Sequence, residues 1–198
     1  MDLNKFNKPT LLLDEAKCRS NIKMMADKAK ISGVNFRPHF KTHQSAEVGT
    51  WYRDEGVNSI TVSSVTMANY FASVGWKDIT IAFPLNTRET DEIFSMADSI
   101  NLNILISDTE QVNSLTKKSN FIGGYFIKIN TGYNRSGIEW DDADQLMRII
   151  DKMKLKTDIR FMGFLTHSGH TYHARSREEI KDIYNDTIMK CSRLRSLV

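Results

Sequence analysis

The chain has 198 residues, of which 40% are hydrophobic and 26% charged, and its 27 basic and 24 acidic residues leave a formal net charge of +3. This composition is ordinary for a globular domain and excludes long disorder, collagen and an acidic tail. Because the basic residues are scattered and form no cluster, we expect a small molecule as partner, and neither nucleic acid nor a membrane.

Short β-rich runs alternate with segments of helical period along the whole chain. The helical segments include residues 22–29, 146–153 and 180–194, where apolar side chains recur every three or four positions. The β-rich runs predict seven strands, at residues 10–14, 35–41, 59–63, 78–83, 102–107, 125–131 and 160–167.

Alternation of strands and helices with short connections implies a parallel sheet covered by helices. A doubly wound nucleotide-binding sheet would have a glycine-rich turn after its first strand, but no GxGxxG or GxxxxGK[ST] motif occurs. This favours an α/β fold of the (β/α)8 TIM-barrel type. Such barrels need about 250 residues, so we expect an incomplete barrel, with residues 1–198 as one partial domain of a longer protein. The alternative is an open sheet.

The two cysteines, Cys18 and Cys191, form no CxxC pattern, and we interpret them as free thiols in a reducing compartment. The N-terminus has no apolar signal-peptide core, and no apolar run approaches the roughly 20 residues of a membrane span. The sequence therefore predicts a cytoplasmic protein.

All five histidines lie in two segments, each at the C-terminal end of a predicted strand: His39 and His43, then His167, His170 and His173. In parallel α/β folds this edge of the sheet carries the active site. The clustering therefore predicts a functional site, although a single histidine is more often structural.

The first histidine segment belongs to a predicted strand whose alternation places Arg37, His39 and Lys41 on one face. If that face lines a barrel, the crowding is costly unless an anion lies among the three groups or a lysine loses its proton. A lysine with a lowered pKa is a nucleophile toward aldehydes. The alternative is that the strand end reaches solvent and Lys41 is a surface charge.

Two further segments carry polar chemistry after a strand. Residues 163–173 contain three imidazoles, hydroxyls and a phenol, which fit either a metal site or a polar loop, but they form no HExxH motif. In residues 128–138, Gly132 and Gly137 bracket Arg135, whose guanidinium suits a phenolate, carboxylate or phosphate.

These three segments together resemble the fold-type III enzymes that depend on pyridoxal phosphate, with the alanine-racemase-like barrel. The branch that they resemble most is that of D-threonine aldolase and D-serine dehydratase. Residues 37–43 (RPHFKTH) are similar to the RPHxKTH stretch around the cofactor lysine of that branch. Residues 128–137 resemble its TGxxRxG strand and turn, and residues 163–172 its GxxTHxGHxY segment.

At the matching positions, the resemblance implies that Lys41 forms the Schiff base with the cofactor and that Arg135 contacts either the phenolate oxygen of the cofactor or the nearby lysine. It also implies that His167 lies against the pyridine ring and that Tyr172 positions cofactor or substrate. The other histidines of the matching motifs are further candidates for polar contacts with cofactor or substrate: His39, His43 and His170.

The resemblance also implies parts that would lie outside residues 1–198: a phosphate-binding loop, the last barrel strands and a C-terminal β domain. Residues 1–14 would supply a lead-in strand to that β domain. We expect no metal ligand within this chain, and a divalent metal and a homodimer only in a full-length protein.

The activity implied is that of a lyase acting on D-serine or a D-3-hydroxyamino acid, by dehydration or retro-aldol cleavage. Two alternatives stay open. One is a pyridoxal-phosphate-binding or homeostasis protein without turnover, or a catalytically incomplete fragment. The other is a metal hydrolase that uses the histidine segments.

Overall fold

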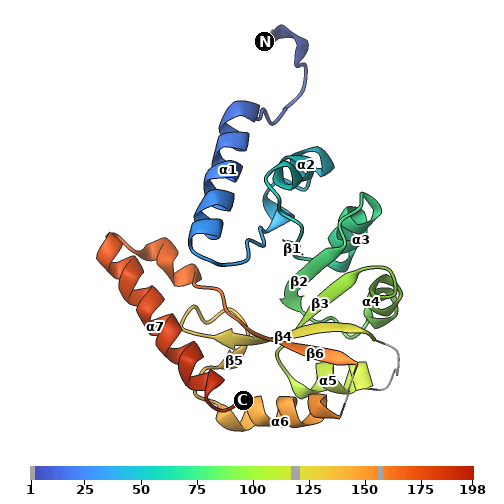
Figure 1. Ribbon diagram of the computed structural model, residues 1–198, viewed down its shortest axis with the longest axis vertical. Coiled ribbons are helices and arrows are strands. Elements are labelled where there is room, and N and C mark those ends of the chain that lie inside the picture. The colour runs from blue at the N-terminus through green and yellow to red at the C-terminus, as the bar shows by residue number, and fades with distance from the viewer. Residues whose placement is uncertain (1–2, 117–120, 156–157) are drawn as a thin grey trace.

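Parallel strands form one six-stranded sheet in the part of the chain that the structure describes (Figure 1). The structure is a computed structural model and describes residues 3–116, 121–155 and 158–198. The strands are β1 (Ile60–Val62), β2 (Asp78–Pro84), β3 (Asn101–Ile106), β4 (Gly123–Asn130), β5 (Ile138–Glu139) and β6 (Ile159–Leu165). Their order is β1-β2-β3-β4-β5, and β6 also pairs with β4. Among the described residues no strand pairs with the outer side of β6, so the sheet stays open.

Helices follow most strands of the described chain. The α-helices are α1 (Glu15–Ile31), α2 (Ala46–Asp54), α3 (Val65–Ser73), α4 (Thr90–Ala97), α5 (Thr109–Thr116), α6 (Ala143–Lys154) and α7 (Arg177–Arg195). Short 3-10 helices are η1 (Leu3–Lys5), η2 (Phe40–Thr42) and η3 (Gly169–His173). Several helices begin where an N-cap side chain accepts the backbone N–H three residues later: Asp14, Ser45, Ser64, Asp142 and Ser176.

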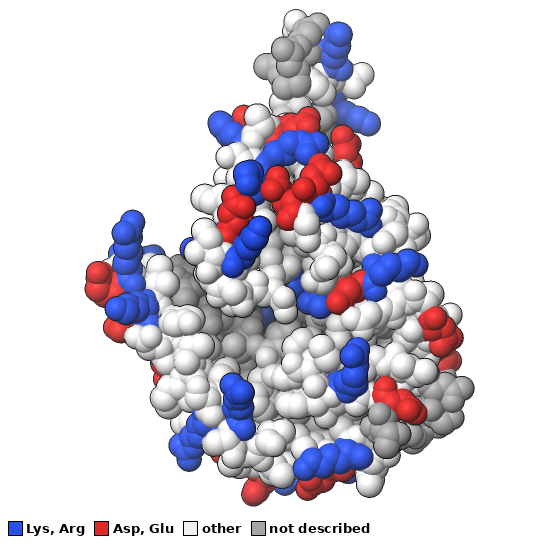
Figure 2. All heavy atoms as spheres, viewed as in Figure 1, with Lys and Arg blue, Asp and Glu red and all other residues white. Residues whose placement is uncertain are grey.

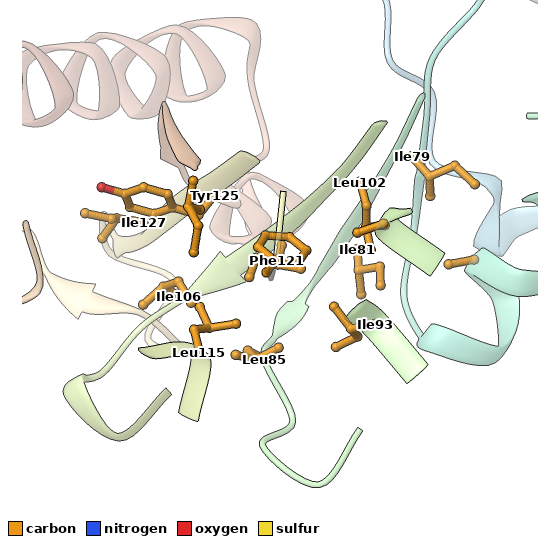
Figure 3. Close-up of a cluster of buried hydrophobic side chains, with 14 of the residues drawn as sticks. Ile79, Ile81, Leu85, Ile93, Leu102, Ile106, Leu115, Phe121, Tyr125 and Ile127 are labelled. Carbon is orange, nitrogen blue, oxygen red and sulfur yellow. The ribbon is translucent and has the colours of Figure 1, made fainter. Parts of the chain in front are cut away.

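The hydrophobic core lies between one face of the sheet and helices α3 to α6 (Figure 3). Alternate residues of the central strands, such as Ile79, Leu102 and Ile127, point to this face and are fully buried. The residues between them point to the other side. We call this side the polar face, because its residues in β2, β3 and β4 include Asp78, Thr80, Asn103 and Lys128.

Charged side chains of both signs are mixed over α1 on the face shown in Figure 2. Arg19 pairs with Glu15 at 2.8 Å and with Asp54 at 2.9 Å, and Lys23 pairs with Asp27 at 2.8 Å. Exposed pairs of this kind contribute about 0–1 kcal/mol each. The mixture leaves no basic patch over this helix.

Five of the seven predicted strands are confirmed, as β1, β2, β3, β4 and β6. The helical segments are confirmed as well, and the four apolar residues of α6 that the period places on one face are all buried. On α7 the corresponding residues are only partly buried: Thr187 and Leu194 are buried. Ile180, Tyr184 and Ile188 are about half accessible to solvent.

The strand predicted at residues 10–14 is not formed among the described residues. This segment has no regular structure and precedes α1, and Leu11 is 98% exposed. An apolar run forms a strand only where another strand can share its backbone hydrogen bonds. None of the described strands pairs with this segment.

The strand predicted at residues 35–41 is wrong, apart from a single bridge between His39 and Thr61. Pro38 has no N–H to donate to a ladder. The chain then turns into η2, where Phe40 enters the core.

Two predictions about the environment can be compared with the structure. Both cysteines are free. None of the described helices is long and apolar enough to cross a membrane.

Phe40 anchors the segment that carries Lys41, and its removal should cost stability. Its side chain is fully buried, with ring centroids 4.9 Å from Phe71 and 5.1 Å from Trp76. We expect Phe40→Ala to lower the free energy of unfolding by about 3–5 kcal/mol, because it leaves a cavity in the core. Urea unfolding measures this, with the exposed Phe83→Ala as a control that changes it by about 0.5 kcal/mol or less. Equal effects of the two substitutions would contradict the packing described.

Candidate active site

Basic side chains from three segments meet at the C-terminal end of the sheet. Burial lowers the pKa of His167, and the positive charges of Arg135, Lys128 and Lys41 lower it further. Burial also lowers the pKa of His39, with smaller contributions from Lys41 and His167. Charges act on one another in this way only when they are close. The charges of Lys41 and Arg135 thus both reach His167, and those of Lys41 and His167 reach His39.

Lys41 lies in η2, directly after the buried Phe40, and its side chain is exposed. The turn is held by His39, whose Nδ1 accepts the backbone N–H of Lys41 at 3.3 Å. The pKa of His39 falls to about 4, chiefly because of burial. His39 is therefore neutral at neutral pH and adds no positive charge beside the Lys41 amine.

His43 packs against the core. Its ring lies 4.5 Å from the Phe40 ring and is stacked on Tyr52 at 5.9 Å. Its Nδ1 accepts the N–H of Ser45, which precedes α2. Of the residues proposed from sequence, His43 is thus the one whose contacts are mainly structural.

His167 lies in a cluster of aromatic rings with Tyr133 and Tyr172. The His167 ring centroid is 5.4 Å from Tyr133 and 5.9 Å from Tyr172. The hydroxyl of Tyr172 lies 3.4 Å from Nε2 of His167. Tyr133 can approach only because residue 169 is glycine, since a Cβ there would lie 2.6 Å from the Tyr133 ring. Sequence reasoning missed Tyr133.

His170 belongs to the same region. It lies in η3, and its charge also lowers the pKa of His167. Its Nδ1 is buried and has no hydrogen-bond partner in the described part of the chain. A buried polar atom without a partner is costly, and a ligand that supplies one removes that cost.

Arg135 is carried by residues 131–137 between β4 and β5, which we call the Arg135 loop. Its guanidinium lies 5.6 Å from the centroid of the Tyr133 ring. Gly137 has a φ of +111°, and a Cβ there would lie 2.8 Å from the carbonyl oxygen of Lys128. Glycine thus allows the loop to return to the strand that it leaves.

Lys128 is a second residue that sequence reasoning did not assign. It lies on the polar face of β4, is 4% exposed, and has its pKa lowered to about 8 by burial and by the charge of Arg135. The signal was present, because Lys128 alternates with Ile127 and Ile129 in a strand.

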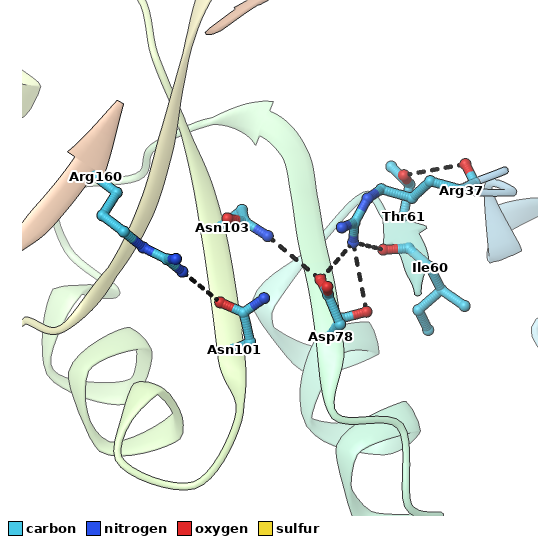
Figure 4. Close-up of polar contacts among 7 residues, drawn as sticks. All are labelled: Arg37, Ile60, Thr61, Asp78, Asn101, Asn103 and Arg160. Carbon is cyan, nitrogen blue, oxygen red and sulfur yellow. Dashed lines mark hydrogen bonds and ion pairs between the residues drawn. The ribbon is translucent and has the colours of Figure 1, made fainter. Parts of the chain in front are cut away.

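The predicted crowding of Arg37, His39 and Lys41 on one face is wrong. Arg37 donates to Asp78 at 2.6 Å and to the carbonyl oxygen of Ile60, at the N-terminal end of β2 (Figure 4). Because residues 35–41 do not form a strand, their side chains do not alternate as expected.

Metal ligation finds no support in the described residues. Within residues 3–116, 121–155 and 158–198, no group of three or more histidine, cysteine, aspartate or glutamate side chains could hold a metal ion. The histidines of the two segments instead meet lysine, arginine and tyrosine side chains.

Comparison with known proteins gives a consistent set of relatives. The family described as alanine racemase, N-terminal domain, matches residues 13–194. D-serine dehydratase of Dictyostelium discoideum is 29% identical over 92% of this chain and 50% of its own length. 3-hydroxy-D-aspartate aldolase of Paracoccus denitrificans (strain Pd 1222) is 26% identical over 91% of this chain and 48% of its own length.

A solved structure supports the same fold. D-threo-3-hydroxyaspartate dehydratase from Delftia sp. HT23 superimposes with a TM-score of 0.90 at 23% identity, over 98% of this chain and 52% of that chain. The chain thus spans about half the length of the relatives that it matches.

The lowered pKa of His39 predicts a loss of stability in acid. The unfolded chain protonates His39 near pH 6.5, whereas the folded protein does so only near pH 4. The free energy of unfolding should therefore fall as the pH drops through this window, by on the order of 1–2 kcal/mol from His39. His39→Asn keeps an acceptor for the Lys41 N–H but cannot titrate, so it should flatten this slope.

Urea unfolding at pH 7.5, 6 and 4.5 measures the slope. The exposed His173→Asn is the matched control and should leave the slope as it is in the wild type. A slope unchanged by His39→Asn would show that His39 is not held neutral by burial.

Proposed function

The chain belongs to the alanine racemase N-terminal domain family, and on this basis we propose that it is the barrel part of a pyridoxal-phosphate-dependent lyase that acts on D-serine or a D-3-hydroxyamino acid. The proposal is supported by the pairing of β4 with β6, which brings the segments of Arg135 and His167 side by side, with Thr131 and Thr166 hydrogen-bonded at 2.7 Å. The charge of Lys41 acts on His167 as well. The names of the relatives agree with this proposal: D-serine dehydratase, D-threo-3-hydroxyaspartate dehydratase and 3-hydroxy-D-aspartate aldolase.

The described side chains fit such a cofactor. Every charge that acts on His167 lowers its pKa, so the site carries an excess of positive charge that suits a phosphorylated anion. Lys41 offers an exposed amine for the aldehyde group. His167, Tyr133 and Tyr172 offer flat rings. The unpartnered Nδ1 of His170 remains available to a polar group of the ligand.

Each residue of the site would have one task. Lys41 would hold the cofactor through its amine, and Arg135 would face the phenolate oxygen. His167 would lie against the pyridine ring of the cofactor, with the Tyr172 hydroxyl hydrogen-bonded to Nε2 of His167. When bound, pyridoxal phosphate withdraws electrons from the bonds at the α-carbon of an amino acid. His39 is neutral at neutral pH, so it accepts the backbone N–H of Lys41 and holds the η2 turn without placing a positive charge beside the Lys41 amine.

Further expectations belong to the same proposal. We propose a cytoplasmic location, a homodimer for the full-length protein, and a D-amino acid in place of nucleic acid or membrane as partner. Within the described residues, no group of three or more histidine, cysteine, aspartate or glutamate side chains could hold a metal ion. If the full-length protein uses a divalent metal, we propose that its ligands come from other residues.

Labelling of lysines tests the proposal directly. The protein is incubated with pyridoxal phosphate, reduced with borohydride, digested and analysed by mass spectrometry. We expect a phosphopyridoxyl group on Lys41, its loss in Lys41→Arg, and an unchanged label in the surface control Lys77→Arg. The sharpest competitor is Lys128, because a lysine with a pKa of about 8 is also a good nucleophile. A label on Lys128, or one scattered over surface lysines, would overturn the role of Lys41.

Products released by the full-length protein then separate the alternatives, because the chain spans only about half the length of its relatives. A dehydratase releases pyruvate and ammonia from D-serine, and an aldolase releases glycine and an aldehyde from a D-3-hydroxyamino acid. A protein that only binds the cofactor carries the Lys41 label but releases none of these. A metal hydrolase predicts bound zinc and no change of absorbance when pyridoxal phosphate is added.

A further inference from the structure

Asn130 is the last residue of β4, only 6% exposed, and every hydrogen-bonding position of its side chain is used. Its Oδ1 accepts the backbone N–H groups of Gly132 at 3.1 Å and of Asn134 at 3.0 Å. Its Nδ2 donates to Oδ1 of Asn134 at 2.9 Å and to Oε1 of Glu139 at 2.8 Å. A carboxamide offers two donor hydrogens and two acceptor lone pairs, so the side chain is saturated.

The chemistry of the partners leaves this side chain only one orientation. Backbone N–H groups can only donate, so they must face Oδ1. The carboxylate of Glu139 can only accept, so it must face Nδ2. An aspartate at position 130 would place a second carboxylate against Glu139, and an alanine would leave both backbone N–H groups without their acceptor. The site thus requires an amide as long as residue 139 is a glutamate.

The Arg135 loop depends on these bonds because its backbone is unusual. Gly132 has a φ of +130°, and Asn134 has a φ of +58°, in the left-handed region that few non-glycine residues adopt. Such conformations persist where the surroundings hold them. Asn130, which directly precedes the loop, accepts the backbone N–H groups of both residues.

Glu139 holds the C-terminal end of the Arg135 loop. In the parallel register of β4 and β5, Asn130 lies directly opposite Glu139. The bond between the two side chains therefore joins the strand that enters the Arg135 loop to the strand that leaves it. Because one partner is a carboxylate, this bond is charge-assisted and stronger than one between neutral groups.

We propose that Asn130 and Glu139 are positioning residues that hold the Arg135 loop so that the guanidinium of Arg135 faces the Lys41 and His167 site. Neither residue needs to touch a ligand. The inference rests on the proposed function only in giving Arg135 a cofactor to meet. The geometry itself can be tested in the protein without any ligand.

The first test removes the amide. In Asn130→Ala we expect the amide hydrogens of Gly132 and Asn134 to exchange with solvent about tenfold faster, because each loses its acceptor. We also expect the pKa of His167, followed by NMR, to rise, because displacement of the loop moves the Arg135 charge away. The exposed Asn185→Ala is the matched control and should change neither quantity.

The second test exchanges amide and carboxylate. Asn130→Asp should disturb the loop, because it places two carboxylates against each other. Glu139→Gln should have little effect, because the glutamine amide oxygen still accepts from Asn130. In the double variant Asn130→Asp/Glu139→Gln, the new glutamine amide can donate to the new aspartate. The Asn134 amide has to turn, so that its Nδ2 donates to the aspartate in place of the bond that its Oδ1 accepts from Asn130 in the wild type. We expect the double variant to restore amide exchange and the His167 titration to within about twofold of the wild type.

The third readout is affinity for pyridoxal phosphate, which should weaken about tenfold in Asn130→Asp and recover in the double variant. A residue that merely supports the fold would lower the unfolding midpoint when it is replaced, but would leave the folded protein's affinity for pyridoxal phosphate and its His167 titration unchanged. If Asn130→Ala does not fold, Asn130→Asp and the double variant decide alone. A double variant whose amide exchange and cofactor affinity are the same as those of Asn130→Asp overturns the proposal. Unchanged amide exchange in Asn130→Ala overturns it as well.

The two proposals fail separately. Amide exchange and the His167 titration are measured without cofactor, so they report on Asn130 whether or not Lys41 is labelled. Conversely, absence of the Lys41 label removes the proposed function and leaves the role of Asn130 in placing Arg135 intact.

Discussion

β4 pairs in parallel with both β3 and β6, and this pairing brings together the chain segments that follow the three strands. The Arg135 loop follows β4, and His167 and Tyr172 follow β6. Lys41 reaches the same edge differently, because Phe40 is drawn into the core beside β1 and holds η2 there. The site is thus a consequence of strand direction and of one buried ring, and no residue of the site is close to all the others in sequence.

Much of this arrangement could be predicted from the sequence. The runs that became β2, β3 and β4 are apolar on alternate positions, and the four buried residues of α6 recur with a helical period. The histidines and Arg135 could be placed because they follow such runs, and parallel strands end at one edge. These predictions used only local pattern and direction.

Other features could not be predicted because they depend on partners distant in sequence. Residues 10–14 read as a strand, but a strand needs a neighbour, and none of the described strands pairs with them. Burial lowers the pKa of Lys128 to about 8, and this burial depends on β3 and β6, the neighbours of β4, which the local pattern does not reveal. Asn130 has no signature in sequence at all, since its role lies in which backbone groups it meets.

The two ends of the sheet differ in how their charges are balanced, and this difference indicates which end receives an anion. At the N-terminal end, Arg37 meets Asp78 at 2.6 Å and Arg160 donates to Asn101 (Figure 4). At the C-terminal end, Lys128 is buried near Arg135, and the charges around His167 are all positive. Positive charges that lie close together repel one another, and part of this cost is removed when a negative ligand enters. The folded chain therefore favours an anion at this end even before any residue is assigned a catalytic role.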